Sequence, residues 1–131
     1  MSPDGNHVYV AAGFDDAVTV FSRNKRTGAL TFVETIKDGV GGVDGLEFAG
    51  SVVVSPDGSR VYVAGTDDNA LAVFQRDPTT GVLSFLGALK DGKGGVDGLD
   101  VVTAVTLSPG GRNVYTAASS DHAVAVFGVS E

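Results

Sequence analysis

The 131-residue chain contains no cysteine and no tryptophan, and it has one methionine and two histidines. Without cysteine no disulfide indicates the redox compartment, and no thiol is available for chemistry. Positive charge is also scarce, because 9 lysines and arginines face 16 aspartates and glutamates, a net charge of −7. The one basic cluster, Arg23, Lys25 and Arg26, falls in a turn and should face solvent. We therefore expect no nucleic-acid partner and no anionic membrane partner.

Long hydrophobic runs are missing as well. No apolar stretch is long enough to cross a bilayer, and the residues after Met1 lack the basic and apolar segments of an export signal. The glycine-rich segments are not followed by Gly-Lys-Ser/Thr, so they do not predict a phosphate-binding loop. We expect soluble material with no cofactor, and the compartment stays open.

Glycine is abundant, at 19 residues, and the chain repeats itself without insertions. Ser-Pro-Asp-Gly at residues 2–5 recurs at 55–58, and Ser-Pro-Gly-Gly follows at 108–111, a constant spacing of 53 residues. Such a spacing is typical of folds in which each unit covers the apolar face of the next. We interpret residues 1–131 as one domain with three repeat units, the last incomplete: 2–54, 55–107 and 108–131.

Each complete unit contains four strand patterns, rich in β-branched and aromatic residues and bounded by Gly, Pro and Asp. In the middle unit these patterns cover residues 51–55, 60–65, 70–76 and 83–90. Ser-Pro-Asp-Gly between the first two places proline and glycine where a type I turn favours them. Four antiparallel strands per repeat predict an all-β fold made of β-propeller blades.

The sequence motif Ser-Pro-Asp-Gly-x-x-Val-Tyr-Val-Ala is followed in each full unit by a strand ending in Val-Phe and by Thr-Gly-x-Leu. This pattern resembles the blade repeat of the seven-bladed lactonase-like propellers, a group that includes 6-phosphogluconolactonase and carboxymuconate-lactonising enzymes. It is also similar to the Tyr-Val-Thr-Asn surface-layer repeats. The resemblance covers essentially the whole chain, which encodes about two and a half blades. It implies a propeller fold, with lactone hydrolysis as one alternative function.

The number of strands does not fill whole blades. The first blade, residues 6–37, should lack its innermost strand, and the last, residues 104–129, should lack its outermost strand. In the resembled family the N-terminus often supplies the outermost strand of the final blade, so a missing outer strand is expected at the C-terminal end of a longer propeller. The start at Met1, without an inner strand, indicates a truncated or engineered beginning. Unpaired edges and uncovered blade faces favour association. We therefore expect a homo-oligomer, closed as a ring by blade packing, with a longer natural chain or aggregation as the alternatives. The aromatic residues predicted to pack between blades are Tyr9, Tyr62, Tyr115, Phe21, Phe74 and Phe127.

Two glycine-rich exit loops, residues 37–47 and 90–100, carry three carboxylates each. Oxygen-rich loops of this kind are candidates for calcium. Their spacing matches neither an EF-hand nor the Gly-Gly-x-Gly-x-Asp roll. We favour turns whose glycines need positive φ, and we predict no metal ligand.

Other ionisable residues also have structural explanations. The aspartate pairs at 15–16 and 67–68 are candidates for acid–base chemistry, but they lie in turns that favour aspartate. His7 and His122 differ in type from their repeat counterparts, which predicts surface positions.

No nucleophile stands beside a base, and no Gly-x-Ser-x-Gly elbow occurs. We therefore predict that the chain is not an enzyme and has no catalytic or cofactor-binding residue. The interpretation we favour is a structural and interaction scaffold that assembles through blade faces and strand edges. The alternatives are a lactone hydrolase and a lectin-like multivalent binder, and a small-molecule or glycan ligand stays open.

Overall fold

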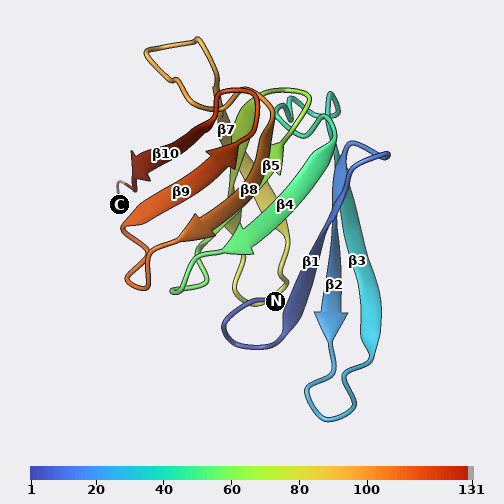
Figure 1. Cartoon of the computed structure of the whole chain (residues 1–131). Coiled ribbons are helices and arrows are strands. Elements are labelled where there is room, and N and C mark those ends of the chain that lie inside the picture. Colours follow the sequence, from blue (N-terminus) through green and yellow to red (C-terminus); the bar gives the residue numbers. More distant parts are fainter. Residues whose placement is uncertain (130–131) are drawn as a thin grey trace.

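The computed structural model describes residues 1–129, which form ten β-strands and no helix (Figure 1). Among these residues there is accordingly no helix of the length and apolarity that a membrane crossing requires. The strands are β1 His7–Ala12, β2 Ala17–Arg23, β3 Leu30–Lys37, β4 Ala49–Val54, β5 Arg60–Gly65, β6 Ala70–Arg76, β7 Leu83–Lys90, β8 Val102–Leu107, β9 Asn113–Ala118 and β10 Ala123–Gly128.

The strands form three antiparallel sheets: β1-β2-β3, β4-β5-β6-β7 and β8-β9-β10. We call them the first, middle and third blades, and Figure 1 shows them side by side in chain order. The predicted all-β propeller fold is confirmed. Strands β5, β6 and β7 have the predicted bounds, whereas β4 begins at Ala49, two residues earlier than expected. Within the described residues the first blade has no innermost strand and the third no outermost strand.

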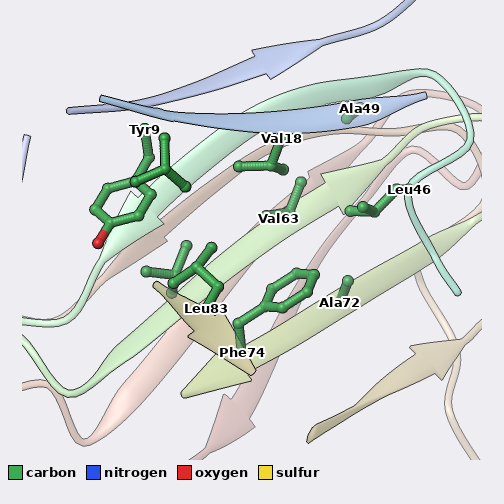
Figure 2. Packing of buried hydrophobic residues seen from close by; sticks show 10 residues of the cluster. Tyr9, Val18, Leu46, Ala49, Val63, Ala72, Phe74 and Leu83 are labelled. Atoms are coloured by element: carbon green, nitrogen blue, oxygen red, sulfur yellow. The ribbon is translucent and has the colours of Figure 1, made fainter. Parts of the chain in front are cut away.

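The middle blade is covered on one face by the first blade and on the other by the third blade. Successive side chains of β5 point to opposite sides of the sheet, so they alternate between these two contacts. Val61 and Val63 pack toward the first blade, in one cluster with Tyr9, Val18 and Val20. Figure 2 shows Val63 beside Tyr9 and Val18. On the opposite face of the same strand, Tyr62 and Ala64 pack toward the third blade. That second cluster also contains Leu71, Leu99, Val102, Val105, Val114 and Ala118.

Three of the six predicted blade-packing aromatics are buried between blades. Tyr9, Tyr62 and Phe74 are at most 5% exposed, and the Phe74 ring lies 5.5 Å from that of Phe85. Tyr115, Phe21 and Phe127 are only half-buried. For these three the prediction of blade packing is therefore met only in part.

Candidate functional site

The first exit loop brings two aspartates together with a third from the middle blade. The carboxylates of Asp38, Asp44 and Asp68 each offer an oxygen within 4.8 Å of the others. We call these residues the first aspartate cluster. The backbone N–H of Leu46 donates to Asp38 Oδ1 at 3.0 Å, and that of Glu47 donates to Asp68 Oδ2 at 3.1 Å. The cluster thus fixes the path of the chain into the inner strand β4.

Lys90, the last residue of β7, neutralises part of this cluster. Its Nζ lies 2.9 Å from Asp44 Oδ2 and 3.8 Å from Asp68 Oδ1. The hydrogen bond from Lys90 lowers the pKa of Asp44, and the same bond raises the pKa of Lys90. Burial, together with the neighbouring carboxylates, raises the pKa of Asp38. Three carboxylates at this distance could ligate a hard cation, but here the Lys90 ammonium forms ion pairs with two of them, Asp44 and Asp68.

The second exit loop repeats the arrangement 53 residues later. Asp91, Asp97 and Asp121 form the second aspartate cluster, again with an oxygen of each within 4.8 Å of the others. Asp91 accepts from the backbone N–H of Leu99 at 2.9 Å, and Asp121 accepts from that of Asp100 at 3.0 Å. Within residues 1–129 no lysine or arginine forms an ion pair with this cluster.

Glu47 does not join the two loop aspartates with which the sequence analysis grouped it, because Asp68 takes that place. Its side chain is instead exposed just before the inner strand β4. Repulsion from Asp68, and to a lesser extent from Asp16, raises the pKa of Glu47. Asp100 is its counterpart before β8. Each of the two carboxylates stands two residues before an inner strand, Glu47 before β4 and Asp100 before β8.

The turn aspartates have the structural role that the sequence predicted. Asp16 and its counterpart Asn69 are left-handed, each with φ of 51°. Their side chains also reach the next blade: Asp16 Oδ1 accepts from the backbone N–H of Phe48 at 2.8 Å, and Asn69 Oδ1 accepts from that of Val101 at 2.9 Å. Sequence reasoning missed this bridging role, for which the only signal was a polar residue at the same place in each repeat.

A buried polar network joins the first and middle blades. The Arg76 side chain, on β6, is 2% exposed. Its Nε donates to Tyr9 Oη at 2.9 Å, and its Nη1 donates to the Gly58 carbonyl at 3.1 Å. Its Nη2 lies 2.8 Å from His7 Nδ1 and 3.2 Å from Asp4 Oδ2. One guanidinium thus satisfies four partners from three separate segments.

The prediction of a surface position is wrong for His7, which is only 4% exposed. The repeat comparison could not reveal this, since the counterpart positions hold arginine and asparagine. Burial, and then the charge of Arg76, lower the pKa of His7, which favours the neutral imidazole. His122 is exposed as predicted, in the turn before β10.

The four-stranded middle blade, covered on both faces by neighbouring blades, defines a β-propeller. Comparison of the sequence with protein families shows which propeller family it is. The family described as "Lactonase, 7-bladed beta-propeller" matches residues 1–97, and the chain belongs to this family. The structure of the periplasmic gluconolactonase PpgL of Pseudomonas aeruginosa is similar, with 30% sequence identity and a TM-score of 0.82. That match covers 99% of this chain but 34% of the gluconolactonase.

Other structures share the fold at lower identity. A Bacteroides uniformis protein provisionally assigned as a 6-phosphogluconolactonase has 22% identity and a TM-score of 0.80, over 100% of this chain and 35% of its own. The Cps50 (Swd1) propeller domain of Myceliophteria thermophila has 14% identity and a TM-score of 0.73, over 99% and 39%. A search of curated protein sequences found no match. The chain thus spans about a third of the length of these structures.

These findings overturn one expectation from the sequence. We expected no enzyme because no nucleophile–base pair is recognisable, but the lactonase family and its gluconolactonase relative point to a hydrolase. The expectation failed because it required a nucleophilic side chain, whereas hydrolysis by an activated water molecule needs only a suitably placed base.

Proposed function

We propose that this chain forms blades of a lactone hydrolase. The observation that carries the proposal is membership of the lactonase family over residues 1–97, supported by 30% identity to a gluconolactonase over 99% of the chain. The substrate class is a cyclic ester of a sugar acid. Because the chain spans 34% of that relative, a complete channel requires further blades.

Glu47 and Asp100 are the bases we assign to the reaction. A water molecule adds to the lactone carbonyl carbon, the ring C–O bond breaks, and the product is an open-chain hydroxy acid. A carboxylate that takes the proton from this water accelerates the addition. Glu47 is exposed at the start of an inner strand, and its pKa is raised by Asp68, which makes it a stronger base than an isolated glutamate.

Proton release from glucono-δ-lactone tests this assignment, with the spontaneous rate in buffer subtracted. We expect turnover by the parent protein and a loss of at least tenfold in kcat for Glu47→Gln combined with Asp100→Asn. Asp15→Asn is the matched control, since it removes a carboxylate from an exposed turn outside the proposed site. A parent rate equal to that of buffer would refute the function, and full activity of the double variant would refute the bases.

Self-association is a second proposed property, and the two uncovered blade faces support it. The outer face of the first blade carries Val10 and Phe32, 42% and 61% exposed. On the third blade the face carries Val124 and Val126, 71% and 59% exposed, beside Tyr115. Exposed apolar faces of this kind favour a protein partner.

The repeat makes these two faces complementary. Tyr115, Val124 and Val126 are the counterparts of Tyr9, Val18 and Val20, which in the first blade pack against Val61, Val63 and Phe74. The repeat counterparts of Val61, Val63 and Phe74 lie on the free face of the first blade, and they are Val8, Val10 and Phe21. The third blade of one copy can therefore pack on the first blade of the next, as a head-to-tail interface that closes into a ring.

Light scattering of Val126→Asp tests this interface. The charge should lower the mass of the parent assembly to that of a smaller species, because an aspartate buried between blades has no partner. Val40→Asp is the control, since Val40 is 63% exposed but lies in an exit loop. Equal masses for the parent and Val126→Asp would argue against the interface.

A further inference from the structure

Two phenylalanines form an exposed pair at the end of the molecule where the inner strands begin. Phe14, in the turn between β1 and β2, is 95% exposed, and Phe48, just before β4, is 38% exposed. Their ring centroids are 5.4 Å apart, and the ring planes meet at 81°. In Figure 1 the β1–β2 turn and the start of β4 lie at the same end of the molecule. The aromatic pair thus connects the first and middle blades outside the two core clusters.

The backbone around Phe48 fixes the position of its ring. The Phe48 N–H donates to Asp16 Oδ1 at 2.8 Å, and the Phe48 carbonyl accepts from the Thr66 N–H at 3.1 Å. Its φ is 52°, in the left-handed region that a large side chain rarely adopts. The ring lies over Gly13, where an added Cβ would be 3.4 Å from it. Phe48 is therefore held against the β1–β2 turn, beside Phe14.

The corresponding places in the other two blades have no aromatic ring. Phe14 corresponds to Asp67 and Ser120, and Phe48 corresponds to Val101. Asp67 and Ser120 are also exposed, in blades whose inner strands β4 and β8 are present. Exposure is therefore a property of this turn in every blade, and the aromatic pair is specific to the contact between the first and middle blades.

Carboxylates border the aromatic pair. Glu47 directly precedes Phe48, and its carbonyl accepts from the Asp67 N–H at 3.0 Å, which places the next turn beside it. Repulsion from Asp68, and then from Asp16, raises the pKa of Glu47. Within residues 1–129 no lysine or arginine forms an ion pair with Glu47, Asp16 or Asp67. This negative surroundings favour a positively charged ligand over a neutral or anionic one.

We propose that Phe14 and Phe48, together with Glu47 and Asp67, form a binding site for a small quaternary ammonium ligand. The faces of aromatic rings attract cations, and the carboxylates add to that attraction. A quaternary ammonium also brings methyl groups that pack on the rings, whereas a primary ammonium is compact and strongly hydrated. The inference concerns binding alone and does not depend on hydrolysis.

Titration of choline into the full 131-residue protein, followed by two-dimensional NMR of the backbone amides, tests the site. We expect saturable shifts of the Phe14 and Phe48 amides, with a Kd in the millimolar range. The uncharged isostere of choline, in which a carbon atom replaces the nitrogen, should bind about fivefold more weakly, because it lacks the attraction to the rings and the carboxylates.

Two pairs of variants separate the rings from the carboxylates. Phe14→Leu keeps an apolar side chain without the ring and should weaken choline binding about two- to fivefold. Phe32→Leu is the matched control, since Phe32 is 61% exposed on β3, and it should leave the affinity unchanged. Asp67→Asn should weaken binding of choline but not of the isostere, whereas Asp97→Asn makes the same change in the second exit loop and should have no effect.

Three results would overturn the proposal. The first is no saturation of the shifts up to about 100 mM choline. The second is equal affinity for choline and its uncharged isostere, which would show that the charge is not recognised. The third is unchanged choline affinity in Phe14→Leu, since carboxylates alone would then account for the binding.

Discussion

Arg76→Ala should destabilise the chain far more than the same substitution at its repeat counterpart, Arg23. The Arg76 side chain is 2% exposed, and its removal leaves His7 Nδ1 and the Gly58 carbonyl without their hydrogen-bond donor. Each buried group left unpaired costs about 1–3 kcal/mol. Tyr9 keeps its hydrogen bond to the Gly81 carbonyl, at 2.7 Å. We therefore expect a loss of about 3–5 kcal/mol in the free energy of unfolding.

Arg23→Ala is the matched control within the same chain. Arg23 is half-buried, and its Nη1 donates to the Gly5 carbonyl at 3.2 Å. Its removal should cost no more than about 1 kcal/mol. The free energy of unfolding of both variants is measured by urea titration. Circular dichroism follows the unfolding, because the chain has no tryptophan whose fluorescence could do so. Losses that agree within about 0.5 kcal/mol would refute the argument that the number of buried partners sets the cost.

Three further predictions concern the core, the histidine and one glycine. Phe74→Ala should cost about 3–5 kcal/mol because Phe74 is fully buried, whereas Phe14→Ala, at 95% exposure, should cost under about 0.5 kcal/mol in the same urea assay. The lowered pKa of His7 stabilises the fold above pH 6.5, its ordinary pKa, and this contribution is lost as the pH falls, because only the unfolded chain then binds the proton. The melting temperature should therefore drop between about pH 7 and pH 5, and His7→Asn should flatten that drop; parallel profiles would contradict this role. Gly65→Ala should reduce stability, since its Cβ would collide with the Gly45 carbonyl oxygen, while Gly128→Ala meets open space; equal melting temperatures would rule out the collision.

The strands were predictable because the repeat places turn residues at constant intervals and alternates side chains with a period of two. This is why the bounds of β5, β6 and β7 were predicted without error. The start of β4 was missed because Ala49 and Gly50 lack the β-branched side chains that indicate a strand.

The contacts between blades were not predictable from the pattern. Asp68 joins Asp38 and Asp44 because two turns from neighbouring blades meet in space, although they are distant in the sequence. His7 is buried because Arg76, on another blade, lies beside it. Both sites depend on how one blade packs on the next, and periodicity within a blade contains no information about that packing.

The mass of the parent protein in solution, measured by light scattering over a range of concentrations, tests the central claim that the uncovered blade faces need a partner. We expect a discrete multimer in which the Val126 face of one copy covers the Phe21 face of the next. A species with the mass of a single chain at every concentration would show that both apolar faces are stable in water alone, and it would contradict the proposed blade-to-blade interface.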